Sequence, residues 1–327
     1  MGTEKITESL SRGKVQRVNQ YKYAGLHINE EGTLKLHIEK LNGASHSICR
    51  ELMSMASPKE VGVEYIRVRL KLFEKCYMES LLHGLHAWHI STKEVKEIEK
   101  IQSKYLKMLL ELPSSTPTAA LYLETGIWPV TERIEYLTSM LYQNMSKRNE
   151  IAPLVIQHQQ ISPTKNSIPE RMKQIVKCTT KRLEDIKGMH KSDWKKVIKR
   201  GLRKKINKRL KQETKGKTKS RFVTGSSFRR KEYLNKEDGH LAKEILRIRL
   251  NMFPTSSNFK TGNENLLCPH CESNKDTTEH IVHCYTNVKI AALKSEDSPE
   301  WAEIVKGFME YKKEKDKRDA KDREKED

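Results

Sequence analysis

The segment STKEVKEIEKIQSKYLKML, residues 91–109, predicts a helix from its first residue to its last. Ser91 and Glu94 have the spacing of a capping box, in which each side chain accepts a hydrogen bond from the other residue's backbone N–H. The apolar residues that follow recur every three or four positions, which is the period of one helix face. They are Ile98, Ile101, Tyr105, Met108 and Leu109. Pro113 cannot continue a helix, so we expect an amphipathic, packed helix that ends before it.

Helical spacing of apolar residues extends to both sides of this segment. It covers about 34–57 and 59–82, and the break between the two falls at a proline. Downstream, Thr116 is the expected cap of a short helix that Gly126 ends, and a further helix follows. We therefore expect an all-helical domain over residues 33–150.

Strand-like alternation is found near the N-terminus. Residues 21–30, YKYAGLHINE, alternate briefly and run into the turn signal Glu30-Glu31-Gly32. We expect one short β-strand there and no other. The predicted fold class is therefore mostly α: a helical bundle, a basic helical connector and a small metal module, with at most a short N-terminal strand.

The remainder of the chain divides by composition. Residues 151–170 contain several prolines and form the predicted linker. Residues 171–236 form a basic helical connector, in which 213–227, rich in Lys, Thr, Gly and Ser, is expected to be mobile. A helix and a metal module occupy 237–310. The segment 311–327 is so highly charged that we expect a disordered tail.

Net charge indicates the class of partner. The chain has 327 residues and a formal net charge of +20, and residues 171–236 contain 25 Lys and Arg against 5 Asp and Glu. A polyanion, RNA or DNA, is therefore the expected partner. We expect the predicted helix over about 193–212 to supply the phosphate contacts, because the basic run is densest there. The candidates are Lys195, Lys196, Lys199, Arg200, Arg203, Lys204, Lys205, Lys208 and Arg209.

Two alternatives for this basic region stay open at the level of sequence. A run of Lys and Arg also occurs on a plain solvated helix face or as a nuclear-import signal. Aromatic residues lie within the region and either stack on bases or anchor small cores, and we favour cores. They are Trp194, Phe222, Phe228 and Tyr233.

Four soft metal ligands lie close together near the C-terminus. Cys268-Pro-His-Cys271 has the spacing that lets two thiolates reach one ion from a tight turn. His280 and Cys284 are four residues apart, so on a helix they project from the same face. Three cysteines and one histidine fill a tetrahedral site, which predicts one structural zinc ion without catalytic chemistry.

The segment before His280 supports a helix at this site. Asp276 and Glu279 have the spacing of a capping box, with Asp276 as the expected N-cap. His270 and His283 remain alternative ligands, because either imidazole could replace that of His280 as the nitrogen ligand.

Several enzyme classes lack their motifs here. Lys215-Gly-Lys-Thr218 has the form of a P-loop ending, but Lys211 stands where the first glycine is needed. There is no nucleophile elbow, no glycine-rich dinucleotide turn and no Asp-Asp pair to hold catalytic metal ions. The repeated histidines at 83, 86 and 89 fit the end of a packed helix better than a metal site.

Four segments, in this order, resemble the C-terminal part of a reverse transcriptase from a non-LTR (LINE-type) retrotransposon. YKYAGLHIN (21–29) resembles the last palm strand, with Ala24 where the family usually has leucine. MESLLHGLHAWHIS (78–91) resembles the end of the first thumb helices. The segment EIEKIQSKYLKMLLELPSSTPTAALYLETGIWPVTERI (97–134) is the most similar, and the Cys/His cluster resembles the module after the thumb.

This resemblance implies which part of the enzyme each segment would correspond to. Residues 1–32 would be a remnant of the palm and 33–150 a thumb-like domain. The polymerase acids would lie before residue 1, so this chain would grip an RNA–DNA primer–template or target DNA without a catalytic centre. Two alternatives remain: part of a complete RNA-directed DNA polymerase encoded by a longer reading frame, and a non-catalytic, zinc-dependent interaction adaptor.

The compartment is expected to be intracellular, nuclear or cytoplasmic. Six cysteines without a disulfide framework suit a reducing environment. The N-terminal residues lack the apolar run of a signal peptide, and no stretch approaches the length of a membrane span.

Overall fold

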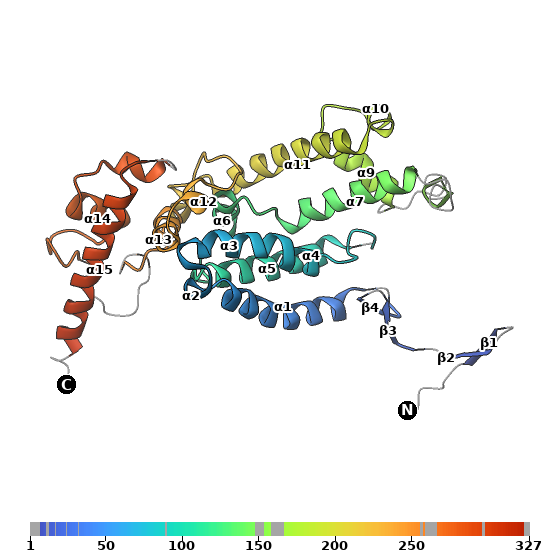
Figure 1. Ribbon diagram of the computed structural model, residues 1–327, viewed down its shortest axis with the longest axis horizontal. Helices are drawn as coiled ribbons and strands as arrows, with labels where there is room; N and C mark the ends of the chain where they lie inside the picture. Colours follow the sequence, from blue (N-terminus) through green and yellow to red (C-terminus); the bar gives the residue numbers. More distant parts are fainter. Residues whose placement is uncertain are drawn as a thin grey trace. The chain divides into compact units, whose positions relative to one another are not determined.

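The computed structural model describes most of the chain. The described residues are 7–10, 13–16, 18–23, 25–31, 33–88, 90–147, 154–157, 167–255, 258, 267–295 and 298–323. Within them the fold is mostly α-helical, which confirms the predicted fold class (Figure 1). The chain forms two compact units. One comprises Met1–Ile48, Tyr77–Gln102 and Val130–Ile198, and the other comprises Cys49–Cys76, Ser103–Pro129 and Lys199–Asp327.

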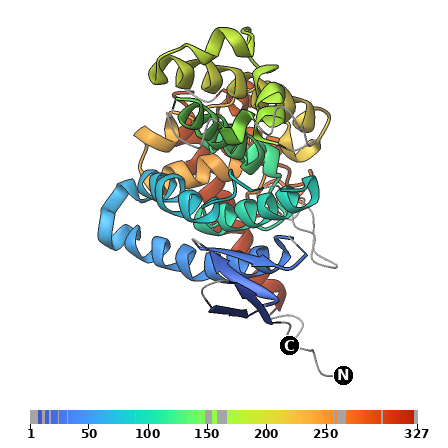
Figure 2. The ribbon, with the colours of Figure 1, turned by 90° about the vertical axis from the view of Figure 1, so that its right-hand side faces the viewer.

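Two hairpins precede the first helix (Figure 2). Strands β1 (Thr7–Leu10) and β2 (Gly13–Gln16) pair antiparallel, as do β3 (Gln20–Tyr23) and β4 (Leu26–Asn29). The prediction of a single strand over 21–30 was therefore wrong. Gly25 has φ +87°, in the left-handed region that favours glycine, and it turns the chain back between β3 and β4.

The capping box of helix α5 (Thr92–Leu109) is confirmed. Ser91 Oγ accepts from Glu94 N at 3.2 Å, and Glu94 Oε2 accepts from Ser91 N at 2.8 Å. Glu94 Oε1 also accepts from Leu34 N at 2.9 Å, directly before helix α1 (Lys35–Met55). One carboxylate therefore satisfies backbone donors at the starts of two helices.

The helix expected over 59–82 is broken into short pieces. They are α2 (Pro58–Val61), a 3₁₀ turn (Gly62–Glu64), α3 (Tyr65–Leu72), a π-helical turn (Phe73–Tyr77) and α4 (Met78–Leu81). Gly62 has φ +60° and interrupts the helix after α2. Val63, in the 3₁₀ turn that follows, is 60% exposed.

Helices α6 (Thr118–Thr125) and α7 (Val130–Ser146) are the next helices along the chain. Gly126 ends α6 with φ +65°, as expected. The expected cap at Thr116 was wrong: its hydroxyl donates to the Pro113 carbonyl at 2.6 Å, and Pro117 occupies the N-cap position without a side-chain hydrogen bond.

The basic connector consists of α9 (Ile168–Val176), α10 (Leu183–Lys187) and α11 (Lys191–Thr214), followed by a 3₁₀ turn (Thr218–Ser220). The segment 213–227, expected to be mobile, instead contributes to a core. Phe222 and Val223 are 3% and 0% exposed. Most of the predicted linker 151–170 lies outside the described residues.

The C-terminal part contains α12 (Tyr233–Lys236), α13 (Gly239–Arg249), α14 (Thr278–Tyr285), a 3₁₀ turn (Ile290–Lys294) and α15 (Trp301–Arg323). The expected disordered tail from residue 311 is helical as far as Arg323. Phe308 and Tyr311 are fully buried, so tertiary packing holds a segment that composition alone assigns to solvent. Among the described residues, every helix is too short or too polar to cross a lipid bilayer.

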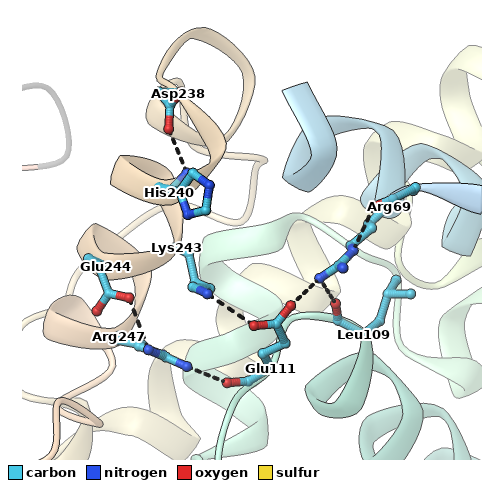
Figure 3. Close-up of polar contacts among 9 residues, drawn as sticks. Arg69, Leu109, Glu111, Asp238, His240, Lys243, Glu244 and Arg247 are labelled. Carbon is cyan, nitrogen blue, oxygen red and sulfur yellow. Dashed lines mark hydrogen bonds and ion pairs between the residues drawn. The ribbon is translucent and has the colours of Figure 1, made fainter. Parts of the chain in front are cut away.

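A charged cluster ties three elements of the second unit together (Figure 3). Glu111, with φ +54°, follows α5, and its carboxylate accepts from Arg69 Nη1 at 2.6 Å and Lys243 Nζ at 3.0 Å. Arg247 Nη2 donates to the Glu111 carbonyl at 2.9 Å. Burial raises the pKa of Glu111, but the hydrogen bonds from Arg69 and Lys243 outweigh it and leave that pKa below its usual value.

Candidate metal centre and basic helix face

The four predicted ligands come together in space. Cys268 and Cys271 lie in the turn after Leu267, and His280 and Cys284 lie one turn apart on α14. Their donor atoms all lie within 4.8 Å of one another. The Cys268 and Cys284 sulfurs are 3.9 Å apart, and the Cys271 sulfur is 3.3 Å from His280 Nε2. This cluster can hold one metal ion.

Local backbone geometry shapes the cysteine turn. Cys268 N donates to the Asn274 carbonyl at 2.7 Å, and Glu272 N donates to the Cys268 carbonyl at 2.9 Å. Backbone N–H groups of Ser273 and Asn274 point at the Cys271 sulfur and lower the pKa of that thiol. The loop therefore makes Cys271 easier to deprotonate than an ordinary cysteine.

The thiol of Cys284 is harder to deprotonate than an ordinary cysteine. Burial, together with the neighbouring Cys268 and Cys271 sulfurs, raises the pKa of Cys284 to about 12. Three thiolates so close together repel one another in the absence of positive charge. A bound cation would remove that repulsion, and the four donors can hold one metal ion.

The helix start differs from the predicted capping box. The N-cap is Thr277, whose Oγ1 accepts from His280 N at 3.2 Å. Asp276 is 0% exposed and accepts instead from the Tyr311 hydroxyl at 2.5 Å. The helix was predicted correctly and its cap was not. Since both residues are good caps, the tertiary contact to Tyr311 decides between them.

Neither alternative ligand belongs to the cluster. The side chain of His270 is 57% exposed, and its Nδ1 lies 3.7 Å from Glu314 Oε2. His283 is exposed on α14. The gathered donors are those of the four predicted residues.

Helix α15 supplies an outer layer of contacts to this centre. The Tyr285 hydroxyl lies 4.0 Å from the Cys268 sulfur and donates to Glu314 Oε2 at 2.5 Å. Arg318 Nη1 donates to the Leu267 carbonyl at 2.7 Å, directly before the first ligand. Contacts of this kind orient ligands and raise metal affinity. Sequence reasoning missed them, because Glu314 and Arg318 stand in a uniformly charged segment with no local signal.

Helix α15 approaches the end of α14 closely, and this approach brings its side chains within reach of the metal centre. A Cβ at Gly307 of α15 would lie 2.4 Å from Thr286 Cγ2, so only glycine allows the observed approach of α15 to the end of α14.

Helix α11 has two opposed rows of side chains with the same four-residue spacing. The buried row consists of Ile198, Leu202, Ile206 and Leu210, each 0% exposed. The exposed row has the same interval but is shifted by two residues from the buried row. It consists of Lys196, Arg200, Lys204 and Lys208. An offset of two residues places them about 200° away on the helix, so the basic row faces solvent.

The nine predicted phosphate contacts differ in exposure and pairing. The exposed ones are Lys196, Lys199, Arg200, Arg203, Lys204 and Lys208, and the half-buried ones are Lys195, Lys205 and Arg209. Lys196 pairs with Asp193 at 3.3 Å and Arg209 with Glu213 at 3.2 Å. Within the described part of the chain, no acid lies at ion-pair distance from Arg200, Arg203, Lys204 or Lys208.

The aromatic residues of the basic region anchor cores, as favoured from the sequence. Trp194, Phe222, Phe228 and Tyr233 are 1%, 3%, 9% and 4% exposed. Trp194 stacks on Tyr142 with ring centroids 6.3 Å apart. These four side chains are therefore not available to stack on bases.

Two of the three repeated histidines lie in a packed turn after α4. The His86 carbonyl accepts from Arg171 Nη1 and from the Thr138 hydroxyl, each at 3.2 Å. His83 and His86 are not part of the gathered metal donors, and His89 lies outside the described residues.

Comparison with known proteins adds no assignment. No family model, curated protein or solved structure matches this chain. The chemistry of the residues themselves must therefore support any function.

Proposed function

We propose that this chain binds nucleic acid through the exposed basic face of α11, with a zinc-organised module beside the C-terminal helix. We further propose that the chain is the thumb-like and zinc-binding part of a non-LTR retrotransposon reverse transcriptase. The order of the four resembling segments supports that origin. Polymerase chemistry would require acids that this sequence does not contain as an Asp-Asp pair.

One observation carries the binding proposal: the unneutralised row on α11. Arg200, Lys204 and Lys208 are exposed, lie at one-turn intervals and have no acid at ion-pair distance in the described structure. Successive members rise by about 6 Å along the helix axis. A regular line of cations of this kind suits the phosphates of a nucleic-acid backbone. It would bind without sequence specificity, because phosphate contacts do not distinguish bases.

Zinc is the ion we propose for the Cys/His cluster. Three sulfurs and one imidazole nitrogen are the donor set that zinc prefers in closed tetrahedral sites. With four protein ligands the ion would have no open position for substrate, so its role would be structural. The outer contacts from Tyr285, Glu314 and Arg318 fit a site that stabilises a fold.

Salt dependence tests the binding proposal. Fluorescence anisotropy with a labelled duplex of arbitrary sequence should show affinity falling by orders of magnitude between about 50 and 200 mM salt, if several phosphates are contacted. Changing the base sequence at constant length should leave the affinity nearly unchanged. A flat salt response would contradict phosphate-backbone binding and would favour the interaction-adaptor alternative.

A further inference from the structure

A second row of cations lies on α5, outside the basic region that the charge distribution singles out. Five lysines recur at intervals of three, four, four and three residues, which keeps them on one helix face. They are Lys93, Lys96, Lys100, Lys104 and Lys107. Four of them are exposed, and Lys107 is half-buried. From first to last the row extends about 21 Å along the helix axis.

The row lies opposite the packed face of α5. The buried side chains of the helix are Ile98, Ile101, Gln102, Tyr105, Leu106 and Leu109. At 100° per residue, their mean direction and that of the lysines differ by about 170°. The lysine face is therefore the solvent face, and the row results from helix geometry rather than from a run of charge in the sequence.

Two of the three acids on α5 are engaged elsewhere. Glu94 accepts from the backbone of Ser91 and Leu34, and Glu99 Oε2 accepts from the Thr131 hydroxyl at 3.4 Å. Lys107 Nζ donates to the Ser114 carbonyl at 2.9 Å, and the Lys104 ammonium lies 5.0 Å from the centre of the Tyr105 ring. In the described structure no acid lies at ion-pair distance from Lys93, Lys96 or Lys104.

Helix α15 has a different arrangement of charge, because its basic and acidic side chains are mixed. Its second half, Lys312–Arg323, contains Lys and Arg interleaved with Glu and Asp at almost every turn. On the lysine face of α5 a single acid, the half-buried Glu97, accompanies the five lysines, so the net charge of that face is positive.

We propose that the lysine row on α5 is a second phosphate-backbone contact, used by the same nucleic acid class as α11. This inference rests on the proposed function and adds a surface that the clustering of charge along the sequence does not reveal. The partner is taken to be nucleic acid because a row of cations about 4.5 to 6 Å apart along one helix face suits the repeating phosphates of a nucleic-acid backbone.

Three charge-matched triple variants test the inference. Lys93→Gln/Lys96→Gln/Lys104→Gln removes three charges from α5, and Arg200→Gln/Lys204→Gln/Lys208→Gln removes three from α11. Lys312→Gln/Lys313→Gln/Lys317→Gln removes three exposed charges from α15 as the control. Anisotropy with labelled duplex DNA, duplex RNA and an RNA–DNA hybrid is measured across a salt series, and circular dichroism melts check folding.

The expected result is that the α5 and α11 variants each lower the salt slope of binding by about 2 to 3, since each phosphate contact contributes about 0.9. The α15 control should change the slope by less than about 1. If the α5 variant behaves like the control while the α11 variant loses binding, the inference fails and the proposed function stands. If neither variant differs from the control, both fail.

A competition experiment separates nucleic acid from an acidic peptide. Poly-glutamate and an unlabelled duplex are compared as competitors at equal charge concentration. The duplex should compete far better with wild-type protein, and this advantage should shrink in the α5 variant. Equal competition by poly-glutamate, in the wild type and in the α5 variant, would overturn the assignment of a phosphate backbone to this row.

Discussion

Arg249 and Glu124 form a two-point ion pair in which both side chains are 0% exposed. Arg249 Nε donates to Glu124 Oε2 at 2.6 Å, and Arg249 Nη2 donates to Oε1 at 2.8 Å. The Tyr233 hydroxyl donates to the same carboxylate at 2.7 Å, and Arg249 Nη1 reaches the Leu293 carbonyl at 3.3 Å. The pair therefore links α6, α12 and α13 to the turn before α15 within the second unit.

Removing one partner of this pair should be costly. Glu124→Gln leaves the Arg249 charge buried without a counter-ion, so we expect a loss of about 3–5 kcal/mol in the free energy of unfolding. Urea denaturation followed by circular dichroism measures it. Arg209→Gln, which breaks the more exposed pair with Glu213, should cost about 1 kcal/mol or less. Equal losses of unfolding free energy in the two variants would show that the buried pair contributes no more to stability than the exposed one.

Metal binding should depend on the cysteines of the cluster and on no others. Cys268→Ser should lose the bound ion and increase amide hydrogen exchange over 267–285, because metal-ligand energy stabilises the loop. Cys178→Ser, a change to a cysteine outside the cluster, is the control and should keep one ion per chain. Elemental analysis by mass spectrometry gives the stoichiometry. Retention of a full equivalent by Cys268→Ser would remove Cys268 from the site.

The contact between α15 and the metal loop should tune affinity without removing the ion. Tyr311→Phe deletes the donor to buried Asp276 and should weaken metal binding about tenfold. Chelator competition with a chromogenic indicator measures the shift, with Lys312→Gln on the same helix as the control. An unchanged metal affinity in Tyr311→Phe would show that the contact between Tyr311 and Asp276 does not influence the metal site.

Acid should destabilise the first unit through His37. This side chain is 5% exposed, and neither ring nitrogen has a hydrogen-bond partner among the described residues. Burial lowers the pKa of His37, as do His27 and His83 nearby. A lowered folded-state pKa means that the unfolded chain takes up the proton first. Stability should therefore be full above about pH 6.5 and fall as pH drops below it.

The His37 prediction can be checked by thermal unfolding between about pH 8 and pH 5. His37→Leu should flatten the decline with falling pH, whereas His190→Gln, at an exposed position, should leave it in place. Parallel declines in wild type and His37→Leu would assign the acid sensitivity to other groups.

Local signals in the sequence were sufficient where short-range contacts decide the structure. The helix over 91–109 follows from a capping box whose two residues lie three positions apart, and both of its hydrogen bonds form. The metal ligands were found for the same reason, since all four lie within one short segment and their spacing fixes the geometry.

Long-range contacts explain the errors. Tyr311 and Asp276, 35 positions apart, bond to each other, and this contact moves the helix cap to Thr277 and packs a segment expected to be disordered. The lysine row on α5 was missed because it is visible only after residues are placed on a helix face. The turn at Gly25 was missed because alternation continues across it.

Lysine footprinting tests the central claim most directly. The protein is acetylated briefly with and without a saturating duplex, and modification at each lysine is quantified by mass spectrometry. Binding through α11 predicts protection of Lys204 and Lys208, with exposed Lys312 and Lys313 of α15 modified equally in both samples. Undiminished modification of Lys204 and Lys208 in the presence of bound duplex would contradict the account.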